Sequence, residues 1–105
     1  MEKKFGRGDI VWLEFDARGH EQAGRRPAVV LSPAEYNVKS GLMIVCPMTT
    51  KKKNYPFEVI SGKGVILVDH IRTVDWHARK AKKKGTVTPA VLRKIRHLLG
   101  LLLPS

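Results

Sequence analysis

The sequence places an acid and a fixed cation on one short glycine-flanked segment, residues 19–27. Glu21 can accept a proton, and Arg26 carries a permanent charge on a guanidinium that forks onto two phosphate oxygens. Apolar runs rich in β-forming residues flank the segment at 9–15 and 27–32, so we expect it to join two strands of a sheet. Catalytic residues concentrate on loops that a rigid sheet holds. The segment is therefore a candidate active-site loop.

RNA is a polymer that side chains alone can cut, because its own 2′-hydroxyl is a nucleophile beside the phosphorus. The protein must supply a base for the 2′-proton, a cation for the phosphoryl oxygens and a proton for the departing 5′-oxygen. Glu21 is the candidate base, Arg26 the candidate cation, and Thr49 or Thr50 a neutral donor to the phosphate; the source of the last proton stays open. The alternative is a surface ion pair between Glu21 and Arg26, worth about 0–1 kcal/mol, with Thr49 ending a strand.

The sequence offers no recognisable metal or cofactor site. Its four histidines are scattered without the short spacings that gather metal ligands, and its single cysteine has no partner. A Walker sequence, a dinucleotide fingerprint and a Gly-x-Ser-x-Gly elbow are all absent. We expect no cofactor and no metal, so an enzyme of this sequence would work with its side chains alone.

The charge of the chain points to a polyanionic partner. The formal net charge is +11, and all nine acids lie at or before Asp75. Residues 76–105 carry eight lysines and arginines and no acid, and a second basic cluster lies at 51–53. A single basic run is often only solvated surface. Two runs and a basic helix in so short a chain favour a face that binds phosphates, on nucleic acid or opposite an acidic protein.

Size and cysteine content suggest one domain over residues 1–105, with a modest core and no disulfide. Cys46 lies in the apolar run 42–48, where we expect a small buried hydrophobic side chain. No apolar stretch approaches the about 20 residues that span a bilayer, and the N-terminus lacks the apolar core of a signal peptide. We expect a cytoplasmic protein that does not bind membranes.

The pattern of short apolar runs predicts a fold that is mainly β with α. We expect strands at 9–15, 27–32, 42–48, 56–60 and 65–75, the last bent or split near Asp69, forming a small antiparallel barrel. A helical turn is predicted at 33–37. After Gly85 the period changes to about 3.6, with Thr88 as cap and Pro89 at the first helical position. This C-terminal amphipathic helix should pack across the open end of the barrel through an apolar stripe: Val91, Leu92, Ile95, Leu98, Leu99 and Leu102.

Several ordered blocks resemble the MazF/PemK toxins of bacterial toxin–antitoxin pairs. The blocks cover residues 8–11, 19–32, 47–50, 55–59, 68–76 and 84–87, and so extend along nearly the whole chain. The resemblance implies an SH3-like (CcdB/PemK-type) antiparallel barrel and a homodimer. It also implies an endoribonuclease that cleaves single-stranded RNA (mRNA) at a short sequence without a metal, leaving a 2′,3′-cyclic phosphate and a 5′-hydroxyl. A cognate acidic, MazE-like antitoxin would neutralise it.

The resemblance also assigns roles by position. It implies that Glu21, Arg26 and Thr49 are catalytic. The residues that it places in loops that grip RNA are His20, Gln22, Thr50 and Lys51. His70 falls near the substrate groove, where many members carry glutamine, and is counted with the RNA-binding residues; an altered base preference and a neutral replacement both stay open. Unpaired RNA is the expected ligand because its base edges are accessible.

Another class of function remains as the alternative. Related barrels include non-catalytic toxins, such as gyrase poisons of the CcdB type, and plain nucleic-acid-binding modules. The Glu-Gln-x-Gly-x-Arg-Pro loop favours the ribonuclease, because gyrase poisons are not expected to carry it. For the dimer, Trp76, Tyr55 and the segment Leu98–Leu103 offer more apolar surface than a small core absorbs, unless they simply complete that core.

Overall fold

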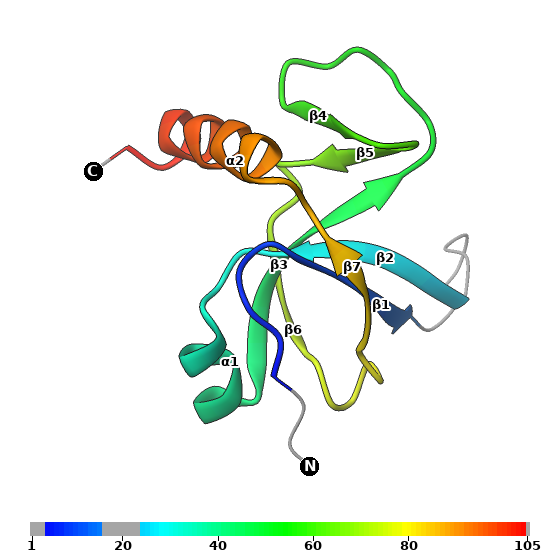
Figure 1. Ribbon diagram of the computed structural model, residues 1–105, viewed down its shortest axis with the longest axis vertical. Helices are drawn as coiled ribbons and strands as arrows, with labels where there is room; N and C mark the ends of the chain where they lie inside the picture. The colour runs from blue at the N-terminus through cyan, green and yellow to red at the C-terminus, as the bar shows by residue number, and fades with distance from the viewer. Residues whose placement is uncertain (1–3, 16–23, 105) are drawn as a thin grey trace.

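The computed structural model describes residues 4–15 and 24–104. Its elements in chain order are β1 (Asp9–Phe15), β2 (Gly24–Val30), α1 (Ala34–Ser40), β3 (Leu42–Thr49), β4 (Glu58–Ser61), β5 (Gly64–Leu67), β6 (Arg72–Asp75), β7 (Lys82–Thr86) and α2 (Pro89–Leu102). The strands pair in the order β4-β5-β3-β2-β1-β7, and β6 pairs with β3. Figure 1 shows a curled antiparallel sheet with α2 beside the β4–β5 hairpin, which confirms the predicted fold class.

β3 is the strand that joins the two parts of the sheet. Its first half pairs with β6 and its last two residues, Met48 and Thr49, pair with β5. β2 pairs with its middle, where Ala28 lies opposite Pro47. Figure 1 shows β3 running from the side of α1 to the β4–β5 hairpin. The end of β3 is thus the point where the two parts of the sheet separate.

The sheet buries apolar side chains on both faces. Successive side chains of a strand point to opposite faces, and Val29 and Val30 accordingly belong to two different hydrophobic clusters. One cluster includes Leu13 and Met43, and the other includes Ile66 together with Ile95 of α2. Burial on both faces explains why the strands read as continuous apolar runs.

α2 forms as the sequence predicts at its start and differs at its end. The Thr88 hydroxyl accepts a hydrogen bond from the Val91 backbone N–H at 3.2 Å, and Pro89 opens the helix. Ile95 is fully buried. Leu102, which the stripe includes, is 38% exposed, and its neighbours Leu101 and Leu103 are more exposed. The buried stripe therefore ends at Leu99, because the last turn of α2 extends past the sheet.

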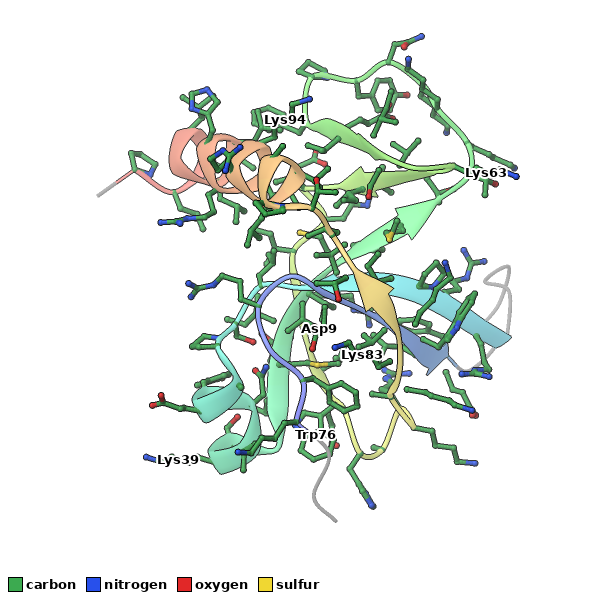
Figure 2. The ribbon with its side chains drawn as sticks, viewed as in Figure 1. Asp9, Lys39, Lys63, Trp76, Lys83 and Lys94 are labelled. Carbon is green, nitrogen blue, oxygen red and sulfur yellow. The ribbon has the colours of Figure 1, made fainter. Side chains whose placement is uncertain are left out.

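The most substantial correction to the predicted strands is β7, which the sequence analysis missed. Three successive lysines favour a solvated surface, yet residues Lys82–Thr86 form the edge strand beside β1. The Lys83 ammonium lies 3.4 Å from the Asp9 carboxylate, as Figure 2 shows for the two labelled side chains. Pairing with β1 thus overrides the weak β-propensity of lysine.

The other boundaries move by a few residues. The predicted run 65–75 is split into β5 and β6, so the break near Asp69 is confirmed. β2 begins at Gly24, earlier than expected, and β4 begins at Glu58, after Pro56. The helical turn at 33–37 is the longer helix α1, which ends where Gly41 adopts a left-handed φ of 74°.

α1 is fixed to the sheet by a buried polar network around Asn37. The Asn37 side-chain amide donates to the backbone oxygens of Phe5, at 2.7 Å, and Ser32, and the Ser32 hydroxyl donates to the Asn37 side-chain oxygen. Trp76 donates from its indole N–H to the Asn37 backbone oxygen at 2.7 Å and meets the Phe5 ring edge-on. Trp76 is thus partly buried and packs against the core, which favours the alternative that it helps to complete that core.

Neither helix of the described structure has the length and apolar character needed to cross a membrane.

Candidate active-site groove

Five of the residues predicted for the site meet in one groove of about 790 Å³: Arg26, Thr49, Thr50, Lys51 and His70. The other residues that line it are Phe15, Pro47, Met48, Lys53, Tyr55, Glu58, Leu67 and Arg72. The groove lies where β2 begins and β3 ends, two points that Figure 1 shows on the same side of the molecule. The predicted residues Glu21, His20 and Gln22 lie outside the described residues.

The strand register explains why Arg26 and Thr49 reach the same groove. β2 and β3 are antiparallel, with Ala28 opposite Pro47. Arg26 is two residues before Ala28, and Thr49 is two residues after Pro47, so both lie at the same end of the strand pair. Both side chains therefore line the groove at this end of the strand pair.

Thr49 also shapes the basic loop that follows β3. Its side-chain oxygen accepts a hydrogen bond from the Lys51 backbone N–H at 3.2 Å. A hydroxyl that accepts one hydrogen bond can still donate its own proton. Thr49 can thus hold the first turn of the loop and donate to a phosphate oxygen.

The groove is strongly basic. Among its described lining residues, Arg26, Lys51, Lys53 and Arg72 are cationic, and Glu58 is the only acid. The guanidinium of Arg72 lies over the Phe15 ring at 5.0 Å from its centroid, and that of Arg79 lies at 5.1 Å. An aromatic face attracts a cation and limits its movement, so Phe15 helps to hold Arg72 at the groove. Such a surface suits a polyanion.

Arg25, the residue before Arg26, points away from the groove. Arg25 lies over the ring of Trp12 at 5.5 Å, where Lys84 also lies at 5.3 Å. Arg25 is not among the residues that line the groove. Successive side chains of a strand alternate between faces, and this alternation assigns Arg26, and not Arg25, to the groove.

His70 reaches the groove from the turn between β5 and β6. Its backbone N–H donates to the Leu67 oxygen at 3.1 Å. Its imidazole Nε2 lies 3.7 Å from an oxygen of Asp69, and 59% of its side chain is exposed. A ligand in the groove can therefore touch the imidazole directly.

Cys46 of β3 is not among the residues that line the groove. Its side chain is fully buried, and its thiol donates to the Val68 backbone oxygen at 3.4 Å. Burial, with a smaller contribution from the Asp69 carboxylate, raises the pKa of the thiol from 9.0 to about 12. The thiol therefore stays protonated, as expected for a small buried hydrophobic side chain. Within residues 4–15 and 24–104, no three His, Cys, Asp or Glu side chains come together to hold a metal ion.

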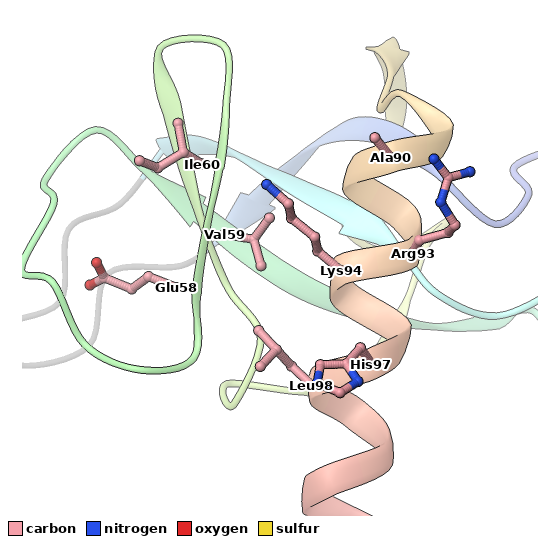
Figure 3. Close-up of a pocket in the computed structure, with 8 residues that line it drawn as sticks. All are labelled: Glu58, Val59, Ile60, Ala90, Arg93, Lys94, His97 and Leu98. Atoms are coloured by element: carbon pink, nitrogen blue, oxygen red, sulfur yellow. The ribbon is translucent and has the colours of Figure 1, made fainter.

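A second hollow, of about 630 Å³, lies between β4 and α2 (Figure 3). It holds none of the predicted site residues. Its lining is Glu58, Val59, Ile60, Ala90, Arg93, Lys94, His97 and Leu98. Glu58 borders both hollows.

Comparison with known proteins identifies the family. A family model described as the PemK-like, MazF-like toxin of type II toxin–antitoxin systems matches residues 6–103. The chain belongs to this family. It is 50% identical over 101 residues to the endoribonuclease toxin MazF of Escherichia coli K12, with 91% of each chain covered. It is 38% identical over 104 residues to the endoribonuclease toxin ChpB of the same strain, with 89% of each covered.

Solved structures agree with this family membership. A chain of the MazE–MazF crystal structure (form II) from Deinococcus radiodurans is 46% identical to this one, with a TM-score of 0.89 over 97% of both chains. MazF of the same organism, crystallised in form I, gives a TM-score of 0.88 at 45% identity. The curled sheet with its C-terminal helix is thus the fold of MazF toxins.

The groove of this PemK/MazF-family protein contains residues that the sequence analysis left out of the site. Phe15, Arg72 and the short stretch that holds both Tyr55 and Glu58 are three separate segments, and no spacing along the chain links these segments to one another. Tyr55 gave one usable signal, since it is an aromatic residue in a polar, lysine-rich stretch. Arg72 also lies only two residues after His70, but its place in the groove depends on the pairing of β6 with β3.

Proposed function

We propose that this protein is an endoribonuclease toxin that cuts single-stranded RNA, such as mRNA, in the basic groove. Two facts support this together: the 50% identity to an endoribonuclease toxin MazF over 91% of both chains, and a groove lined by Arg26 and Thr49 with further cations. The cations suit the phosphates of RNA, and the open groove suits a strand whose bases are unpaired.

The proposed reaction needs no metal ion. The 2′-oxygen attacks the adjacent phosphorus while its proton passes to a base, and the bond to the 5′-oxygen breaks. The products are a 2′,3′-cyclic phosphate and a 5′-hydroxyl. Glu21 is the proposed base, Arg26 stabilises the negative charge that develops on the phosphoryl oxygens, and Thr49 donates a hydrogen bond to the phosphate. Glu21 either takes the proton or only orients the 2′-hydroxyl. This choice, and the identity of the group that protonates the 5′-oxygen, depend on the loop before β2.

The other proposed site residues bind the RNA without taking part in bond breaking. Thr50, Lys51 and His70 line the groove on its β3 and β5–β6 sides, and His20 and Gln22 belong to the same loop as Glu21. Lys51 contributes charge against the phosphates. His70 presents both ring nitrogens and a flat surface, so it is suited to contact a base.

We propose that an acidic, MazE-like antitoxin neutralises this toxin in the cytoplasm. Relatives have been crystallised as MazE–MazF complexes, and this chain carries a net charge of +11. An acidic segment can occupy the groove in place of RNA, because both ligands are anionic. We also propose a homodimer, since several large apolar side chains remain exposed: Ile60, Leu101 and Leu103 are 52%, 60% and 67% exposed.

The decisive experiment tests Arg26. The purified protein and its Arg26→Ala variant are incubated with a long single-stranded RNA in EDTA, and the new 5′ ends are mapped. We expect the parent to cut at one recurring short sequence and Arg26→Ala to be about 100- to 1000-fold slower, the usual cost of losing one group that stabilises developing charge. Arg25→Ala is the matched control. It removes the same charge from the adjacent residue outside the groove and should cut at close to the parental rate.

The results of this experiment distinguish a ribonuclease from a non-catalytic toxin or nucleic-acid-binding protein. Equal loss in both variants would show that Arg26 acts only through general charge. Intact RNA that nevertheless binds in a salt-sensitive way would move the protein to the non-catalytic class, which includes gyrase poisons of the CcdB type. In that case induced cells would show damaged DNA before they lose intact messenger RNA.

A further inference from the structure

An exposed aromatic side chain lies inside the basic groove. Tyr55 lines the groove, and 60% of it is exposed. Lys51 and Lys53 line the same part of the groove. The exposed aromatic surface of Tyr55 among cations has no role in the reaction proposed above.

The backbone that carries Tyr55 is held by one carboxylate. Glu58 accepts hydrogen bonds from the backbone N–H groups of Lys53, at 3.2 Å, and Asn54, at 3.0 Å. Its own backbone N–H donates to the Tyr55 oxygen at 3.2 Å. Figure 3 shows the Glu58 side chain pointing away from α2 and into the loop before β4. Asn54 also adopts a left-handed φ of 59°, which makes the turn sharp.

A negative charge at Glu58 weakens the binding of an anion unless a structural role of this residue offsets the cost. Glu58 is the only acid among the described residues that line the groove, so its charge repels phosphates. A carboxylate that accepts two backbone hydrogen bonds does, however, fix the turn through charge-assisted bonds. The fixed turn in turn limits where the Tyr55 ring can lie.

We propose that Tyr55 is a stacking platform for one unpaired base of the RNA, and that Glu58 is the residue that positions it. This inference rests on the proposed function, since it names a base subsite in the same groove. Every base has a π-face, so an aromatic ring flanked by cations binds single strands by stacking while the cations hold the backbone. Tyr55 contacts the base; Glu58 acts through the loop.

The experiment measures binding to an RNA that carries the mapped cleavage sequence but lacks the 2′-hydroxyl at the scissile position, so that it stays intact. Affinity is followed by fluorescence anisotropy of the labelled RNA. We expect Tyr55→Ala to weaken binding about tenfold, the lower range for the loss of one stacked base. Tyr55→Phe keeps the ring and should bind as the parent does. Tyr36→Ala is the control, because Tyr36 is an exposed tyrosine of α1 outside the groove.

Stacking is then assigned to a base by replacing the nucleotides one at a time with abasic ones. At one position the parent should lose about tenfold in affinity, whereas Tyr55→Ala should lose almost nothing there, because the contact is already gone. A loss of structure in Tyr55→Ala would not produce this position-specific coupling. If no position shows it, Tyr55 is not a stacking platform.

Glu58→Ala tests the positioning role by the sign of its effect, because it removes both the charge and the oxygens that accept from Lys53 and Asn54. If Glu58 acted only through its charge, removing that charge would tighten the binding of RNA. If it positions Tyr55, Glu58→Ala should weaken binding several-fold, and the effect should disappear when Tyr55 is already alanine. Glu35→Ala, on α1, is the matched control for the charge change and should bind as the parent does. Tighter binding by Glu58→Ala would overturn the positioning role.

These results can be distinguished from a failure of the proposed function. A parent that cuts RNA in EDTA, with no effect of Tyr55→Ala on binding, would overturn this inference alone. A parent that binds RNA through Tyr55 without cutting it would overturn the proposed function alone.

Discussion

Arg25 and Arg26 show that the position of a residue along a strand decides which surface its side chain reaches. Both arginines follow Gly24 in the sequence, and both are exposed. Arg26 lines the groove, whereas Arg25 lies over Trp12. The sequence identified Arg26 through its match to a family motif. The physical reason that it can act, the alternation of side chains along β2, became visible only with the register to β3.

The buried thiol of Cys46 should make the free energy of unfolding fall at high pH. The pKa of its thiol is raised from 9.0 to about 12 by burial, so the unfolded chain releases the proton first as the pH rises. This contribution to stability is full below about pH 9 and falls by about 1.4 kcal/mol per pH unit above it. Urea unfolding of the parent and of Cys46→Ala from pH 8 to 10.5 measures it. We expect the parent to lose stability more steeply; parallel curves would contradict the buried, protonated thiol.

The specificity of cleavage should depend on His70. Its imidazole is mostly exposed at the groove, and glutamine offers a different donor and acceptor geometry at the same place. We expect His70→Gln to change the preferred base at one position of the cut sequence, with the overall rate altered less than tenfold. Mapping the 5′ ends produced by both proteins from one RNA tests this. An unchanged consensus would show that the histidine is a neutral replacement.

Among the elements, those with a strong local signal were predicted and those that depend on a partner were not. The capped, proline-started helix α2 and the apolar strands β1, β2 and β3 carry their signal in the local sequence. β7 does not, because its lysine-rich stretch becomes a strand only by pairing with β1.

α1 offers a test of how an element is held in place. Replacing Asn37 with alanine leaves the buried backbone oxygens of Phe5 and Ser32 without its amide. We expect a loss of about 2–4 kcal/mol in the free energy of unfolding, because buried polar groups lose their partners. Lys39→Ala, at an exposed position of the same helix, should cost within about 0.5 kcal/mol. Thermal and urea unfolding measure both; similar values for the two variants would rule out a special role of the Asn37 network.

For the whole molecule, the proposed homodimer follows from apolar surface that this chain leaves exposed. Leu101 and Leu103 extend beyond the sheet at the end of α2. We expect sedimentation to show a dimer at micromolar concentration and Leu101→Asp to shift it towards monomer, because burying an unpaired charge in an interface is costly. Leu42→Asp, an exposed leucine of β3, is the control. A monomeric parent would contradict the proposal.

The sequence by itself determined the mainly β class, the start of the C-terminal helix, the basic character of the chain and the family. Each of these depends on composition, on period or on ordered motifs along the chain. Only the tertiary structure decided that Arg26, Thr49 and His70 share one groove, that the segment with Tyr55 and Glu58 belongs to the same groove, and that β7 is a strand. These facts depend on pairing and packing between segments far apart in the chain, and local sequence does not encode such distances.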